Sequence, residues 1–275
     1  MLKFKPIALN QNTCTKLDTF QFIKFAKKFD GVELNTKDIR KTVSKNYTLK
    51  DIVEALEIYS TKVESIYPLS DFSLCSERDF KTKILKTFSQ MIKYCDKLES
   101  DLIIVTPSLL EPSSNGVPPI PKWRIINRTI KTLKELSKRA YKEDIALGFE
   151  FLLVEHSSIS TLQDAKTVLN SIEGQENLGY ILDTFYFAKY DIDLNMIKDI
   201  KDLIFLIRLA DFDEKLSENI KKLFPGEGNF NFNTFHRYLE KLGYHKPFSI
   251  ALSDHECSEK LLEKISTKFK YKLID

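Results

Sequence analysis

Three charged side chains interrupt otherwise apolar stretches of this 275-residue chain, each near the end of a predicted buried strand. Glu150 lies in IALGFEFLLV, Asp183 in LGYILDTFYF and Arg208 in LIFLIRLAD. A charge in such a stretch is unfavourable unless it is paired, hydrogen-bonded or bound to a metal. Three charges at comparable depths in successive strands therefore predict one shared polar site, and we expect the function of the protein to lie there.

Short apolar runs alternate with segments of helical spacing along the whole chain. In one of these segments Ile126, Ile130, Leu133 and Leu136 recur at the spacing of one helix face. Eight strands alternating with helices predict a (β/α)8 barrel, a TIM barrel, as a single domain over residues 1–275, with a doubly wound open sheet as the alternative. The predicted strands are residues 6–10, 31–35, 62–67, 101–106, 145–152, 180–184, 204–210 and 247–252.

The composition excludes several classes of protein. With 43% hydrophobic residues the chain can bury a full core, and a net charge of only +3 argues against a nucleic-acid partner. No run approaches the roughly 20 apolar residues that span a bilayer, and the apolar stretch at the N-terminus is too short for a signal peptide. The four cysteines, Cys14, Cys75, Cys95 and Cys257, show no CxxC spacing. We therefore expect reduced thiols without a disulfide framework, and a cytoplasmic protein.

Two irregular segments follow predicted strands. Residues 107–122 carry five prolines, including PPIP, and are expected to form a lid or rim on the catalytic face of the barrel. Residues 212–232 contain PGEGN, which reads as a loop because two glycines in a turn do not make a strand-to-helix phosphate cradle. Asp211 directly precedes this second segment and is expected to orient it.

Four segments in order along the chain carry a family resemblance. They are DGVELN at residues 30–35, LSKRAYKEDIALGFEFL, LDTFY at residues 182–186, and PGEGNFNFNTFHRYLEKLGYHKPFSIAL. Together they resemble the xylose-isomerase-like superfamily of sugar isomerases and epimerases. The resemblance spans nearly the whole chain, and it implies a TIM barrel that acts on sugars or sugar phosphates.

The resemblance also implies a divalent metal held by Glu, Asp, His and Glu on the last four strands, with the two glutamates moving protons. Glu150 and Asp183 match the first two ligands, but Arg208 stands in place of the histidine and Ala251 in place of the second glutamate. A guanidinium has no free lone pair for a metal. We therefore expect no cofactor, with Arg208 neutralising Glu150 and Asp183. The resemblance alone leaves open the possibility that Glu150 and Asp183 bind a Mn, Mg, Zn or Co ion.

Other side chains near the strand ends complete the expected site. Glu33 should face the barrel interior, because alternate residues of a strand do so, and it either contacts substrate or completes an interior network. Tyr186, where the family has a substrate-binding histidine, either contacts substrate or packs. His156 is a candidate for substrate binding, or a solvated loop residue. Asp254 and His255 could rebuild a metal-ligand set, or lie in a surface loop.

These residues predict an enzyme of the isomerase or epimerase class that acts on a small polyhydroxylated carbonyl compound by proton transfer. Glu150 would be the base and Arg208 the stabiliser of the oxyanion. A fixed cation lowers the pKa of a neighbouring base and weakens it. A non-catalytic sugar- or metabolite-binding barrel and a dehydratase of the same superfamily therefore stay open as alternatives. The expected partner is a carbohydrate-like small molecule, with no nucleic acid and no membrane, and a homo-oligomer is left open.

Overall fold

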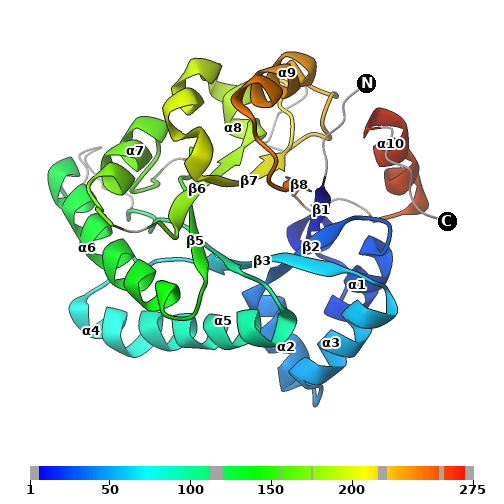
Figure 1. Ribbon diagram of the computed structural model, residues 1–275, viewed down its shortest axis with the longest axis horizontal. Helices are drawn as coiled ribbons and strands as arrows, with labels where there is room; N and C mark the ends of the chain where they lie inside the picture. Colours follow the sequence, from blue (N-terminus) through cyan, green and yellow to red (C-terminus); the bar gives the residue numbers. More distant parts are fainter. Residues whose placement is uncertain are drawn as a thin grey trace. The chain divides into compact units, whose positions relative to one another are not determined.

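The computed structural model describes residues 6–111, 120–154, 156–174, 176–215, 222–253 and 257–269. Its strands form a closed parallel barrel in the order β1 to β8 (Figure 1). All eight predicted strands are confirmed, with ends that differ from the prediction by two residues or fewer. The strands are β1 Ile7–Asn10, β2 Gly31–Asn35, β3 Lys62–Leu69, β4 Leu102–Val105, β5 Ala146–Glu150, β6 Leu178–Asp183, β7 Ile204–Leu209 and β8 Phe248–Ile250. The chain therefore has the (β/α)8 fold that its alternation predicts.

Helices separate the strands, and several begin at a polar side chain that caps them. Asp18 opens α1 by accepting the amide of Gln21, and Asn35 opens α2 by accepting the amide of Lys37. The helices are α1 Thr19–Ala26, α2 Thr36–Ser44, α3 Leu49–Ile58, α4 Glu77–Asp79, α5 Leu85–Leu98, α6 Lys122–Tyr141, α7 Leu162–Asn170, α8 Thr184–Tyr190, α9 Phe232–Leu242 and α10 Glu259–Phe269. Two short 3-10 segments, η1 Gln11–Cys14 and η3 Leu194–Leu203, and one π-helical segment, η2 Phe80–Ile84, complete the set.

The chain divides into two compact units, of which the first comprises Met1–Glu64, Lys97–Glu99 and Leu182–Asp275. In this unit β1 pairs with β2 and β8, and β7 pairs with β8. Helices α1 and α3 pack against each other, and α2 packs on β2 (Figure 1). The strand register sets Asn10 beside Glu33 and Arg208 beside Ser249. Polar residues of four strands are thereby aligned inside the first unit.

The second unit comprises Ser65–Asp96 and Ser100–Ile181. Here β4 pairs with β5 over four residues, and β5 pairs with β6 so that Glu150 lies beside Ile181. Helix α6 packs against α7 and against β5 (Figure 1). A side chain at Gly148 would lie 2.6 Å from Cγ1 of Ile181, so a larger residue at this point of β5 would require the side chain of Ile181 to move. The fifth strand thus reaches Glu150 through a closely packed interior.

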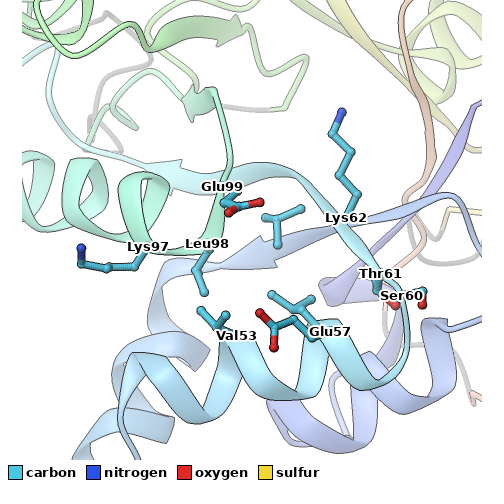
Figure 2. A pocket seen from close by; sticks show the side chains of 10 residues that line it. Val53, Glu57, Ser60, Thr61, Lys62, Lys97, Leu98 and Glu99 are labelled. Carbon is cyan, nitrogen blue, oxygen red and sulfur yellow. The ribbon is translucent and has the colours of Figure 1, made fainter.

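A hollow of about 450 Å³ lies at the start of β3, in the first unit, between α3 and residues 97–99. Figure 2 shows Val53 and Glu57 on one side of it and Leu98 on another, while Lys62 extends away from the helix. Lys62 is the first residue of its strand, so the hollow lies at the amino-terminal end. In TIM barrels that end contributes to stability, and the chemistry lies at the carboxyl ends of the strands. The functional site is therefore expected at the opposite ends of these strands.

The prediction of reduced thiols is wrong for one pair of cysteines. Cys14, at the end of η1, forms a disulfide with Cys257, which precedes α10. Their Cα atoms are 5.5 Å apart, within the range that disulfides require. Spacing along the chain could not reveal this pair because 243 residues separate its members. Cys75 and Cys95 are free thiols, and burial raises the pKa of Cys95 to about 12.

We expect replacement of Cys14 by serine to lower the free energy of unfolding by about 2–4 kcal/mol, because the long closed loop no longer restricts the unfolded chain. Urea denaturation of the Cys14→Ser and Cys95→Ser variants, both without reductant, measures the difference. Cys95 is buried but free, so its variant controls for loss of a buried sulfur. If non-reduced peptide mapping recovers Cys14 and Cys257 as separate thiols, the disulfide is not formed.

Among the described residues, no helix combines the length and the apolar composition needed to cross a bilayer. Half of the predicted lid at 107–122, residues 112–119, lies outside the described residues. Of the second irregular segment, 212–232, residues 216–221 lie outside them, and PGEGN is a loop, as predicted.

Candidate functional site

Glu33 is fully buried in β2 and is the centre of a polar cluster. The side-chain amide of Asn10 donates to its Oε1 over 2.9 Å. Arg208 donates from Nη2 to Oε2 over 2.7 Å and from Nε to both carboxylate oxygens over 3.2 and 3.3 Å. The prediction that Glu33 faces the interior is confirmed. Its pairing with Arg208 was not predicted, because residues 175 positions apart give no sequence signal.

The charge on Glu33 is decided by two opposing effects. Burial by itself would raise the pKa of this carboxyl group. The Arg208 guanidinium outweighs that effect together with hydrogen bonds from Arg208, Ser249 and Asn10, so the pKa lies below its usual 4.5. Glu33 is therefore a carboxylate, and Arg208 is a cation fixed by a two-point hydrogen-bonded pair.

Asp183 is the last residue of β6 and is buried. Its Oδ1 accepts the backbone amide of Phe185 over 2.9 Å, which makes it the cap of α8. Its Oδ2 pairs with the ammonium group of Lys222. The cation beside Asp183 is therefore Lys222, which corrects the expectation that Arg208 neutralises this residue.

Lys222 gave no signal in the sequence. It is one of many lysines in a polar segment, and no spacing marks it. In the structure its side chain is only 19% exposed. Its Nζ lies 5.7 Å from the ring centre of Phe185 and 6.0 Å from that of Tyr186. Tyr186 thereby lies beside the charged pair, with its ring within cation–π range of the ammonium group.

Hydrogen bonds fix the ends of β6 and β7 relative to each other. The hydroxyl of Thr184 donates to the carbonyl of Ala210 over 2.6 Å and accepts the amide of Ala210 over 2.9 Å. The next residue, Asp211, exchanges two backbone hydrogen bonds with Leu223, of 2.8 and 2.9 Å. Leu223 follows Lys222 directly. A continuous path of contacts therefore holds the ammonium of Lys222 on Asp183.

The side chain of Asp211 organises the loop that follows Leu223. Its buried carboxylate accepts the amides of Phe212, Gly226, Gly228 and Phe230 over 2.8 to 3.1 Å. A side chain at Gly228 would collide with the carbonyl of Phe212 and lie 2.5 Å from Oδ1 of Asp211. The predicted role of Asp211 in orienting this loop is confirmed.

The fold agrees with a comparison of the sequence against family models. The family described as xylose isomerase-like TIM barrel matches residues 23–269. This chain belongs to the xylose isomerase-like TIM barrel family. The resemblance found in four ordered segments is thereby confirmed.

Solved structures show the same fold at low sequence identity. An IOLI protein with a bound zinc atom has a TM-score of 0.83 at 20% identity, and the match covers 98% of each chain. A 3-keto-D-glucoside 4-epimerase from E. coli has a TM-score of 0.76 at 15% identity, over 96% of this chain and 98% of that one. A D-psicose 3-epimerase from Clostridium cellulolyticum, solved with D-tagatose, has a TM-score of 0.72 at 16% identity, over 90% and 85%. No curated protein sequence matches the chain.

The remaining predicted site residues of this xylose isomerase-like barrel are placed by the strand or turn that carries them, or fall outside the described residues. Glu150 ends β5 and is 5% exposed, in the second unit. His156 is an exposed turn residue of the same unit with a φ of 65°. Ala251 follows β8 and is buried. Asp254 and His255 fall outside the residues that the structure describes.

Proposed function

We propose that this xylose isomerase-like barrel is a sugar or sugar-phosphate isomerase or epimerase that works without a metal. Two relatives in the same fold are epimerases of a keto-glucoside and of D-psicose, which supports a carbohydrate-like substrate. The observation that carries the proposal is the pair of buried acid–cation contacts, Glu33 with Arg208 and Asp183 with Lys222. Buried, paired charges of this kind cluster at functional sites, which supports a site role for these residues.

The side chains at the ends of β6, β7 and β8 do not fit the divalent metal site that the resemblance implies. Both oxygens of Asp183 are already engaged, one by a backbone amide and one by Lys222. Arg208 offers no lone pair, and Ala251 has no donor atom. The proposed chemistry is therefore built from side chains alone.

In the proposed reaction Glu150 removes a proton from the carbon beside the substrate carbonyl. The electron pair of the broken C–H bond moves onto the carbonyl oxygen, and Arg208 stabilises the resulting oxyanion. Glu33 keeps the guanidinium in one orientation, so no reorganisation is needed during the reaction. Because Ala251 stands in place of a second acid, Glu150 itself returns the proton to the substrate. Isomerisation moves the carbon-bound proton to the neighbouring carbon on one face, while the proton of the neighbouring hydroxyl passes to the former carbonyl oxygen. Epimerisation instead returns a proton to the opposite face of the same carbon, so it needs access to both faces.

We expect a ligand screen to find a sugar, sugar phosphate or sugar acid that raises the melting temperature in EDTA as much as with added manganese. The wild type should convert that ligand, and Glu150→Gln should still bind it but react about 10²- to 10⁴-fold more slowly, because the base is lost. Glu143→Gln changes an exposed carboxylate near the end of α6 and serves as the control.

Three outcomes would contradict the proposal. Turnover that disappears in EDTA and returns with a stoichiometric divalent ion would show a metalloenzyme. A ligand that binds tightly but is not converted would instead support the alternative of a non-catalytic sugar-binding barrel, for which the alanine at position 251 is the supporting observation. A product lacking the elements of water would identify a dehydratase.

A further inference from the structure

Lys222 has no role in the family's ligand set, and the structure gives it one. We propose that the ammonium group of Lys222 is a second donor to the substrate oxyanion, beside Arg208. The inference rests on the proposed function, since it names the group that faces the carbonyl oxygen in that reaction. Its ligand class is an oxygen atom that carries or gains negative charge, as in an enediolate.

The first argument concerns the hydrogen-bonding capacity of Lys222. An ammonium group has three N–H donors, and within the described part of the chain Asp183 is its only acceptor. The side chain is four-fifths covered, which limits the access of water to the remaining donors. A partly covered cation with unused donors is suited to bind a ligand oxygen more strongly than a solvated surface lysine.

The second argument concerns how firmly the ammonium is held. Asp183 fixes it from one side, and the rings of Phe185 and Tyr186 lie within 6.0 Å. The backbone bridge between Leu223 and Asp211 anchors the residue that comes next in the chain. Preorganised donors of this kind stabilise a developing charge without reorganising.

The third argument concerns the number of hydrogen-bond donors that the site offers to the oxyanion. Arg208 directs Nε and Nη2 to Glu33, so a large part of its donor capacity serves that carboxylate. When the C–H bond breaks, one full negative charge develops on the former carbonyl oxygen. Lys222 would donate a hydrogen bond to that oxygen and keep its own proton, while Glu150 carries the proton taken from carbon. Arg208 and Lys222 would then together stabilise the negative charge on this oxygen, which a metal ion stabilises in other members of the family.

The test uses glycolohydroxamate, whose planar anionic oxygens imitate an enediolate. Calorimetric titration in EDTA should show binding to the wild type and about 10-fold or greater weakening in Lys222→Met, as expected for a lost hydrogen bond to a charged group. Lys189→Met is the matched control, because the ammonium of Lys189 likewise lies near the Phe185 ring, 6.0 Å from its centre, but contacts no described carboxylate. That variant should bind the probe as the wild type does.

A second variant distinguishes loss of the binding group from misfolding. Lys222→Met leaves Asp183 without its cation, so Asp183→Asn combined with Lys222→Met removes both charges and should fold normally while still binding the probe weakly. Equal affinity of wild type and Lys222→Met overturns the inference, and so does a wild type that does not bind the probe. Neither result touches the proposed function, which is judged by turnover and its loss in Glu150→Gln.

Discussion

Replacing Glu33 by glutamine is expected to lower the free energy of unfolding by about 3–5 kcal/mol, because the buried Arg208 loses the carboxylate to which it donates three hydrogen bonds. The partner is only 7% exposed, so water cannot take the place of the carboxylate. Arg208→Met should lower the free energy of unfolding by a similar amount, since the buried carboxylate of Glu33 loses the guanidinium that lowers its pKa. Urea denaturation followed by circular dichroism measures both values.

The double variant decides whether the cost comes from the pair. Glu33→Gln with Arg208→Met removes both charges, and its cost should be well below the sum of the two single values. Glu64→Gln is the matched control, because Glu64 is also a buried strand glutamate, but its partner Lys62 is 63% exposed and can be rehydrated. A small effect of Glu33→Gln, equal to that of Glu64→Gln, would contradict a tightly coupled pair.

The same pair predicts a dependence of stability on pH. The pKa of Glu33 is lower in the folded protein than its usual 4.5, so ionised Glu33 favours folding. Its contribution is complete above pH 4.5 and is lost as the pH falls through the lower folded value. The difference in unfolding free energy between wild type and Glu33→Gln should be constant from neutral pH down to this point and shrink below it. If this difference in unfolding free energy instead grows as the pH falls, the pKa of Glu33 is not lowered by folding.

Replacing Asp211 by alanine is expected to destabilise the protein by on the order of 4 kcal/mol, because four backbone amides lose a charged acceptor. The loop that these amides shape also carries Leu223, the neighbour of Lys222. We therefore expect the variant to weaken glycolohydroxamate binding as well, although Asp211 is not proposed to contact the ligand. Thermal unfolding and titration with the probe measure the two effects.

Asp213→Ala provides the control for this prediction. Asp213 lies two residues further along and accepts one exposed amide, that of Lys215. Its replacement should change stability by less than about 1 kcal/mol, since the exposed amide is rehydrated. If Asp211→Ala unfolds no more readily than Asp213→Ala, the carboxylate does not hold the loop.

Part of the fold could be read from the sequence because the signal is local. Runs such as IALN and GVELN are short, apolar and end in a polar residue, and burial on both sides is enough to define a barrel strand. The same alternation places Glu33 inward. Asp211 follows a strand directly, so its role in orienting the next loop was also accessible from its position.

Which charged residues of the site pair with each other could not be predicted from the sequence. Glu150, Asp183 and Arg208 stood out because a charge in an apolar run is unfavourable alone, but this argument does not say which charge neutralises which. The structure pairs Arg208 with Glu33 and Asp183 with Lys222. Lys222 gave no signal, because a lysine in a polar loop resembles every other surface lysine until the loop is folded onto β6.

The sequence by itself determined that eight strands and their helices close into a xylose isomerase-like barrel, and which strands end in a charged residue. Only the tertiary structure decided the pairs of charges, the cap that uses one oxygen of Asp183, and the disulfide between Cys14 and Cys257. The physical reason is the range of the forces. Hydrophobic periodicity acts along the chain, whereas ion pairs and disulfides depend on side-chain positions that closure of the barrel brings together from distant segments.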